Sequence, residues 1–320
     1  IMSSAYSDAL YGQKVWPVTY SMVEVLDAAF FLFFIILITI YAGEAVWRER
    51  QLQNEQIVDA LPTRTSVALL GKLGGLVLVE AALLGLLIVV GVVLQAIKGY
   101  YNFELGLYFK YLFGTTFPSL VQITILAFLV HVLVNQKFVG HLVMILFYIA
   151  RVAASQIGLE HQLFAYADTP PFTYSDMNGF GPFVPNLVLS ALYWSGVAAV
   201  LGVLAYLFWV RGTEDRWATR RRAARLRWSG PVRSVAAVAL VVAVGAGGTI
   251  FYNTNVLNEY RSSKETRRLR ADYERTYKAK LEKLPQPRMA DAEVRVDLEP
   301  ENQAFTIGAT FTYVNRLERP

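Results

Sequence analysis

The chain has 320 residues, of which 55% are hydrophobic and only 17% are charged, and its mean hydropathy is +0.37. Soluble globular domains carry about 25% charged residues, so this composition indicates a protein that crosses a membrane several times. The sequence contains no cysteine, which excludes disulfides, thiolate metal sites and cysteine nucleophiles.

The first 25 residues are polar and aromatic, and Trp16 is typical of a segment at the membrane interface. We therefore interpret residues 1–25 as an extracytoplasmic loop. A continuous apolar run over 26–47 follows, and as a helix it is long enough for one full crossing. Because Ile1 begins the sequence and no signal peptide is visible, we expect that the chain starts partway through a longer polypeptide.

A charged stretch at residues 43–62 separates the first apolar run from the second. Read as a helix, it places Trp47 and Leu61 on one face and Arg48 and Asp59 on another, as in an amphipathic element at a membrane surface. An ordinary cytosolic loop with a solvated charged face explains the same periodicity equally well.

The sequence predicts a mainly α-helical membrane bundle with six spans. The third and fourth spans are separated by only a short polar link, so we expect them to be antiparallel neighbours. The predicted spans are residues 26–47, 66–94, 113–134, 138–157, 186–210 and 232–251. The first five form a permease-like region over 26–210.

The linker at 211–231 is rich in arginine and is expected to be cytoplasmic by the positive-inside rule. Counting crossings from it places the charged stretch at 43–62 inside, and both chain ends and the arginine-free loop at 158–185 outside. The same arginines can also contact anionic lipid headgroups. Nucleic-acid binding is not indicated, because no platform of interleaved aromatic residues is present.

Residues 252–320 are expected to form an extracytoplasmic stalk and the start of a β-rich domain. Apolar residues recur at helical spacing between 269 and 284, and Pro285 is expected to end that helix. Apolar and polar residues then alternate over 294–298 and 305–313, which predicts a β-hairpin. Two strands alone are marginally stable in water, so we expect the sheet to continue beyond the chain given.

Two ionisable residues inside the predicted spans form a candidate intramembrane pair. Glu80 lies near the middle of the second span, where an ionised side chain costs at least about 2.5–3.5 kcal/mol. Arg151, in the fourth span, lies at the same depth when both are counted from the inner ends of their spans. A pair that fixes helix packing, a role on a substrate path, and no contact at all are the three alternatives.

The sequence carries no catalytic motif. Lys72 follows a glycine but lacks the rest of a phosphate-binding loop, so ATP hydrolysis would belong to a separate chain. No His-Glu-x-x-His occurs, which leaves no zinc-peptidase motif. His161 lies near Glu160, Asp168 and Asp176, but their spacing matches no known ligand pattern. We expect no catalytic residue, metal site or cofactor in these residues.

Several pieces of the sequence together resemble one family: Glu44-x-x-Trp47-Arg48-Glu49-Arg50, Asp59-Ala60-Leu61-Pro62, Tyr174-Ser175-Asp176-Met177-Asn178-Gly179-Phe180-Gly181, Phe208-Trp209-Val210-Arg211-Gly212, and Tyr252-Asn253-Thr254-Asn255-Val256-Leu257-Asn258-Glu259-Tyr260. They resemble the permeases of type-2 ABC transporters. More narrowly, they are similar to the second permease half of bacterial proteins that fuse such a permease to a zinc aminopeptidase of the aminopeptidase N type. The resemblance runs over almost the whole chain.

The resemblance implies an exporter permease in the bacterial cytoplasmic membrane, driven by a separate ATP-binding cassette subunit. A second permease half, or a second copy of the chain, would complete it. The stretch at 43–62 would be the coupling helix, and zinc would belong only to a peptidase domain after residue 320. The resemblance assigns docking of the ATP-binding subunit to this set: Glu44, Trp47, Arg48, Glu49, Arg50, Glu55 and Asp59.

Two other functions fit the sequence. The spans can be the membrane anchor of an extracytoplasmic zinc aminopeptidase, without transport. The chain can also be an ion-coupled secondary transporter that uses Glu80 as a proton carrier, although no inverted repeat or broken helix is evident. Copurification of an ATP-binding chain would separate these possibilities from the permease.

Overall fold

The computed structural model describes residues 16–314, except 135, 157, 213–215, 283, 285–287 and 303. Within this part the chain forms two units, residues 1–262 and 263–320, and each is described by itself. The expectations for residues 1–15 and for Pro285 lie outside the described residues.

Six helices of the first unit are long and apolar enough to cross a membrane, which confirms the predicted number of spans. The third is built from α5 (Leu105–Tyr111), a π-helical turn η1 (Leu112–Thr116) and α6. The six main helices are α2 (Thr19–Gln51), α4 (Thr65–Ile97), α6 (Phe117–Leu133), α7 (Lys137–Gln156), α8 (Val184–Phe208) and α10 (Gly230–Phe251). A π-helical turn, η3 (Tyr252–Leu257), extends α10, and a 3₁₀ turn, η2 (Gly181–Phe183), precedes α8.

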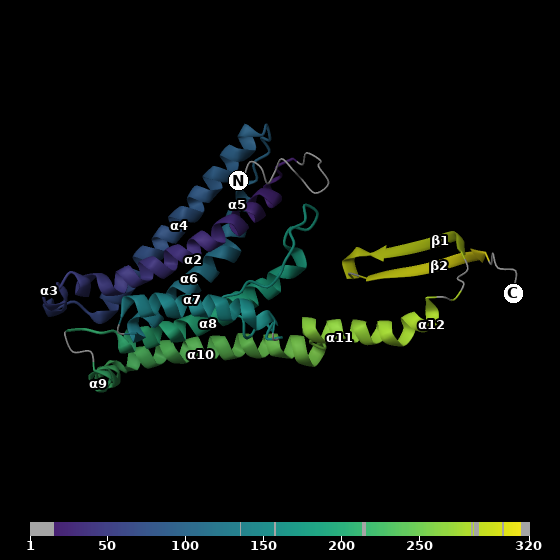
Figure 1. The fold of residues 1–320 in the computed structure, drawn as a ribbon. Helices are drawn as coiled ribbons and strands as arrows, with labels where there is room; N and C mark the ends of the chain where they lie inside the picture. Colours follow the sequence, from purple (N-terminus) through teal and green to yellow (C-terminus); the bar gives the residue numbers. More distant parts are fainter. Residues whose placement is uncertain are drawn as a thin grey trace. The chain divides into compact units, whose positions relative to one another are not determined.

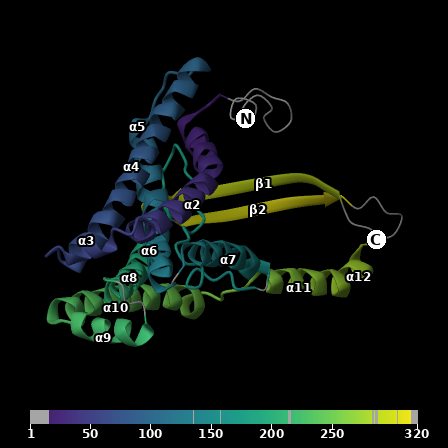
Figure 2. The same cartoon turned by 60° about the vertical axis from the view of Figure 1, so that its left-hand side comes forward.

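Helix α6 lies at the centre of the bundle. It packs against α2, α4, α7 and α8, and α10 packs along the far side of α8 (Figures 1 and 2). Gly196 allows that last contact, because a Cβ atom there would lie only 2.8 Å from the backbone nitrogen of Ala243. The small residue therefore lets the backbones of α8 and α10 approach closely, as is common between helices in lipid.

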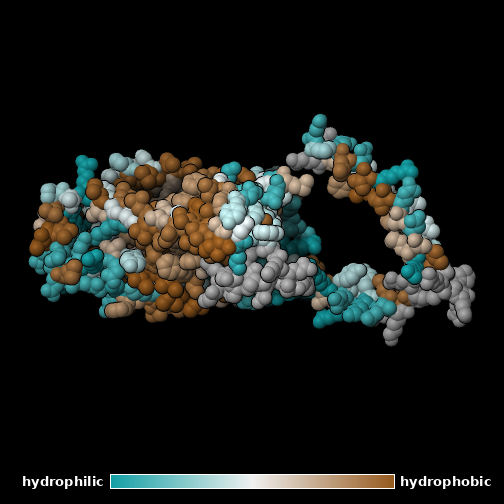
Figure 3. Space-filling model, turned by 90° about the horizontal axis from the view of Figure 1, so that it is seen from above, coloured by the Kyte–Doolittle hydropathy of each residue, from teal (hydrophilic) through white to brown (hydrophobic). Residues whose placement is uncertain are grey.

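The two ends of the bundle differ in chemistry. One end carries the short helices α3 (Glu55–Ala60) and α9 (Trp217–Arg227), on the left in Figure 1, and we name it the basic end. The other carries the connections at 99–104 and 158–180, and we name it the loop end. Between them, exposed leucine, isoleucine and valine side chains cover the outside, and Figure 3 shows hydrophobic residues over the middle of the bundle. Such a surface is stable only against lipid or another apolar partner.

The structure corrects the boundaries of the charged stretch at 43–62, which is not a single amphipathic helix. Glu44 to Arg50 are the last turns of α2, and the chain then turns through Gln53 at φ 55° before α3 begins. The backbone N–H of Asn54 donates a hydrogen bond of 2.9 Å to the carbonyl of Glu49. This bond and the left-handed conformation of Gln53 are typical of a helix C-terminus, and α2 ends here. Helix α2 also begins at Thr19, inside the segment expected to be a loop.

The second unit contains the helix and hairpin that the sequence predicts. Its helical part is α11 (Ser263–Tyr273), the π turn η4 (Glu274–Lys278) and α12 (Ala279–Leu281). Strands β1 (Arg288–Glu299) and β2 (Ala304–Val314) pair antiparallel, with Val296 opposite Ile307. Every residue of both strands is exposed, so the hairpin has no core within this unit.

Candidate functional site

Acidic residues at the basic end are tied to cations on other elements. Each of three predicted docking carboxylates has a basic partner that the sequence did not connect with it. Glu49 lies 2.8 Å from the ammonium of Lys72 in α4. The other two pairs are Glu44 with Lys137 at the start of α7, and Asp59 with Arg211 after the end of α8.

Arg211 fixes the turn between α3 and α4. Its Nη1 and Nη2 atoms each donate a hydrogen bond of 2.6 Å, to the backbone carbonyls of Thr63 and Leu61 respectively. The backbone N–H of Gly212 donates to the Asp59 carboxylate, also at 2.6 Å. The sequence placed Arg211 in the basic linker and in one of the family motifs, but did not predict its contact with the turn between α3 and α4.

Three apolar side chains are exposed at the basic end beside α3. Leu52, Ile57 and Leu61 are exposed beside α3, with Ile57 70% exposed, and we name these three residues the α3 patch. Of the predicted docking residues, Arg48 is exposed, whereas the Arg50 guanidinium lies 5.3 Å from the centre of the Trp47 ring. Glu55 is half-buried at the start of α3.

Arginines of α9 bind the free carbonyl groups at the ends of α6 and α8. Arg220 is only 4% exposed and donates to the carbonyls of Leu133 and Phe208 at 3.3 and 3.1 Å. Arg227 donates to the carbonyl of Leu207 at 3.1 Å. The last carbonyls of a helix lack intrahelical partners and carry partial negative charge, so a guanidinium there is stabilising. The neighbouring Arg221 is exposed, so only part of the linker faces outward.

The two predicted intramembrane residues have different partners. Glu80 is completely buried between α4 and α6, where its Oε1 accepts a hydrogen bond from Thr124 and its Oε2 has no partner. Arg151 forms an ion pair with Asp168 of the loop at the loop end. The described structure therefore does not bring Glu80 and Arg151 together as a pair.

A polar pocket of about 290 Å³ opens at the loop end, and sequence reasoning missed it. At the wall of this pocket, Asp27 of α2 accepts a hydrogen bond of 2.8 Å from the Thr116 hydroxyl of η1. Asp168 lines it from the loop, and Phe31 and Phe172 supply aromatic surface. We name it the loop-end pocket. Asp27 was overlooked because it lies at the boundary between the predicted loop and the first predicted span.

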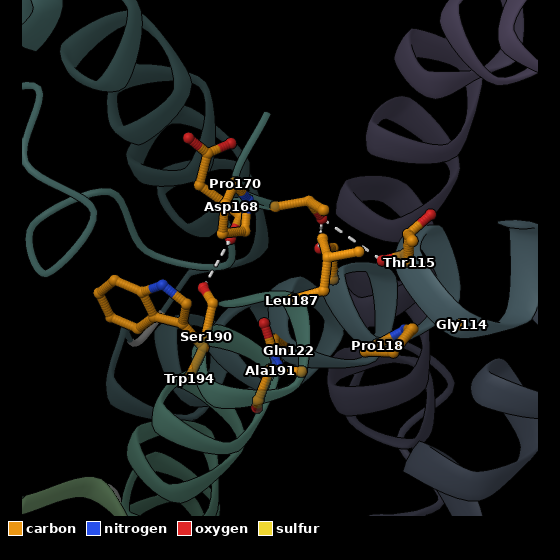
Figure 4. A pocket seen from close by; sticks show the side chains of 12 residues that line it. Gly114, Thr115, Pro118, Gln122, Asp168, Pro170, Leu187, Ser190, Ala191 and Trp194 are labelled. Atoms are coloured by element: carbon orange, nitrogen blue, oxygen red, sulfur yellow. Dashed lines mark hydrogen bonds between the residues drawn. The ribbon is translucent and has the colours of Figure 1, made fainter. Parts of the chain in front are cut away.

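A smaller cavity of about 20 Å³ adjoins the loop-end pocket and shares Thr115, Ser119, Asp168 and Thr169 with it. Figure 4 shows it between the loop, α6 and α8, with the Ser190 hydroxyl bonded to the backbone carbonyl of Asp168 at 3.4 Å. Its volume is that of about one water molecule, so it extends the polar wall rather than forming a ligand site of its own.

The histidines are held by protein contacts. His161 Nε2 lies 3.0 Å from the Thr254 hydroxyl, and its Nδ1 accepts from the backbone N–H of Leu163 at 3.2 Å. The ring of the fully buried His131 lies 4.9 Å from that of His141. In the part of the chain that the structure describes, no three histidine, aspartate or glutamate residues are grouped to hold a metal ion.

Comparison of the chain with protein-family models, curated proteins and solved structures finds no match. The six apolar helices and their exposed hydrophobic surface decide the class. The chain is a polytopic membrane protein. Any closer assignment rests on the sequence motifs and on the geometry described above.

Proposed function

We propose that the chain is the permease component of an ABC exporter and is driven by a separate ATP-binding subunit. The observation that supports this most is the position of α3. None of its six residues is buried, yet it joins the ends of two spanning helices, α2 and α4. Arg211 ties the same turn to the end of α8. A partner that moves α3 would therefore move three membrane helices together.

The contact with the ATP-binding subunit would be centred on the α3 patch, with Arg48 at its edge. Glu49 and Asp59, two acidic residues that the sequence predicts to dock the subunit, would instead hold α3 in place through Lys72 and Arg211. Exposed apolar side chains beside a charged rim are typical of protein interfaces. By the positive-inside rule this end would be cytoplasmic, which would place residues 263–320 on the opposite side.

The test is copurification of ATPase activity. Tagged full-length protein is isolated from membranes of the organism that produces it, and ATP hydrolysis in the eluate is measured. Ile57→Asp should reduce the copurifying activity at least about tenfold, because a charge would be buried in the interface. Met177→Asp is the matched control, because Met177 is 97% exposed at the loop end. Wild-type protein that carries no ATP-binding chain would refute the proposal.

Coupling is tested separately from docking. Charge reversal at Arg48 and Arg50 should leave the ATP-binding subunit attached but uncouple ATP hydrolysis from transport in reconstituted vesicles. If coupling is unchanged in this variant, residues other than Arg48 and Arg50 transmit the force.

One observation favours a second candidate, an ion-coupled transporter. Glu80 is a fully buried carboxyl in a spanning helix with one hydroxyl partner, and such residues often carry protons. Uptake or efflux that follows a proton gradient without ATP, and that Glu80→Gln abolishes, would favour this function. If neither ATP nor a gradient drives transport, a membrane anchor for a peptidase domain becomes the better assignment.

A further inference from the structure

The loop-end pocket combines groups from three separate parts of the fold. Asp27 and Phe31 come from α2, Thr116 comes from the π-helical turn η1, and Asp168 and Phe172 come from the loop before α8. The pocket lies at the opposite end of the bundle from α3 and α9. Its volume of about 290 Å³ is close to the lower limit of pockets that hold small organic ligands.

The ionisable groups that line this pocket are two carboxyls, and only one of them has a cationic partner. Asp168 is neutralised by its ion pair with Arg151. Asp27 has a hydroxyl partner, Thr116, and no cation lies within ion-pair distance of it among the described residues. None of the described residues that line the pocket is a lysine or an arginine. A carboxylate at the edge of a membrane is costly unless a cation pairs with it, so the pocket is complementary to a positively charged ligand.

The remaining lining distinguishes an organic cation from a metal ion. Phe31 and Phe172 give the pocket an apolar wall, and aromatic rings attract ammonium groups. Ser119 and Thr169, whose hydroxyls lie 3.1 Å apart, give acceptors for additional N–H donors. A bare metal ion would occupy only a small fraction of the volume and would make no use of the rings.

We propose that the loop-end pocket binds an organic cation, with a protonated amine paired to Asp27 and a hydrocarbon part packed against Phe31 and Phe172. The pairing also explains why an acidic residue lies in α2 directly before the apolar run of this helix. The proposal concerns binding alone and does not depend on an ATP-binding partner.

The experiment uses full-length protein in lipid nanodiscs without ATP, and dansylcadaverine as the fluorescent amine probe. The probe should bind saturably at neutral pH. Its N-acetylated form, which lacks the charge but keeps the fluorophore, should bind about tenfold more weakly or worse, because it loses a charge-assisted hydrogen bond. Equal binding of the two probes to wild-type protein, or no saturable binding of the amine, would overturn the proposal without any variant.

Variants then locate the site. Asp27→Asn, which keeps the shape of the side chain, should weaken binding of the amine about tenfold or more and leave the acetylated probe unaffected. Glu24→Gln removes the same charge one turn away on α2, at an exposed position that does not line the pocket, and should change affinity less than about twofold. Equal effects of both changes would indicate a diffuse field at this end and would refute a pocket centred on Asp27.

Discussion

Arg211 donates a hydrogen bond of 2.6 Å to the backbone carbonyl of Leu61, across 150 positions of sequence. Its other N–H groups bond the carbonyls of Thr63 and Asp59. Arg211→Ala would leave these carbonyls without their charged partner, so we expect the free energy of unfolding to fall by about 1.5–3 kcal/mol. The thermal unfolding midpoint of the purified protein measures this effect.

The control for Arg211→Ala is Arg222→Ala, which removes an exposed arginine of the same linker. It should change stability by less than about 0.5 kcal/mol. If both substitutions have the same effect, the contribution comes from net charge at the basic end and not from the bonds of Arg211 to the turn.

Arg220 of α9 should also contribute strongly to stability. Because this arginine is 4% exposed and bonds the terminal carbonyls of α6 and α8, Arg220→Ala should destabilise by about 3 kcal/mol or more. Arg220→Lys keeps the charge but loses the forked geometry that reaches several carbonyls, and should recover only part of the loss. The amount of monodisperse protein in detergent and its unfolding midpoint report both changes, with the exposed neighbour Arg221→Ala as the unaffected control.

The sequence predicted the fold more completely than it predicted the contacts of the candidate site residues. Hydropathy located six spans because each needs about twenty apolar residues, and strict alternation located the hairpin. The break at Gln53 was missed because it depends on one left-handed backbone residue that no glycine marks. The partners of Glu49, Asp59 and Glu80 could not be read from sequence, because they lie in distant parts of the chain and depend on how the bundle packs.

Titration of His161, at the loop end, should make the stability of the protein depend on pH. Burial lowers the pKa of its imidazole, and the ring accepts a hydrogen bond from Leu163 through Nδ1. The unfolded chain takes up this proton near pH 6.5, and the folded chain does so only at a lower pH. The neutral ring therefore contributes stability above about pH 6.5, and this contribution is lost as the pH falls through the pKa of the folded state.

We expect His161→Gln to flatten the decline of the unfolding midpoint between about pH 7 and pH 5. The other two histidines remain in both proteins, so the difference between the two profiles reports His161 alone. Parallel profiles would show that His161 titrates alike in the folded and unfolded chains.

Glu80 of α4 accepts a buried hydrogen bond from the Thr124 hydroxyl of α6. Thr124→Val keeps the volume but removes the donor, which leaves Glu80 without a partner and should cost about 1–3 kcal/mol of stability. Thr249→Val is the control, because the exposed Thr249 bonds only a carbonyl of its own helix. In a Glu80→Gln background the stability cost of Thr124→Val should shrink, since an amide is cheaper to leave unpaired than a carboxylate.

The role of Glu80 in transport is tested with the Glu80→Gln variant alone. If this variant keeps its stability but loses transport, the carboxyl acts in the transport cycle. Full transport and normal assembly in the variant would remove Glu80 from the functional residues.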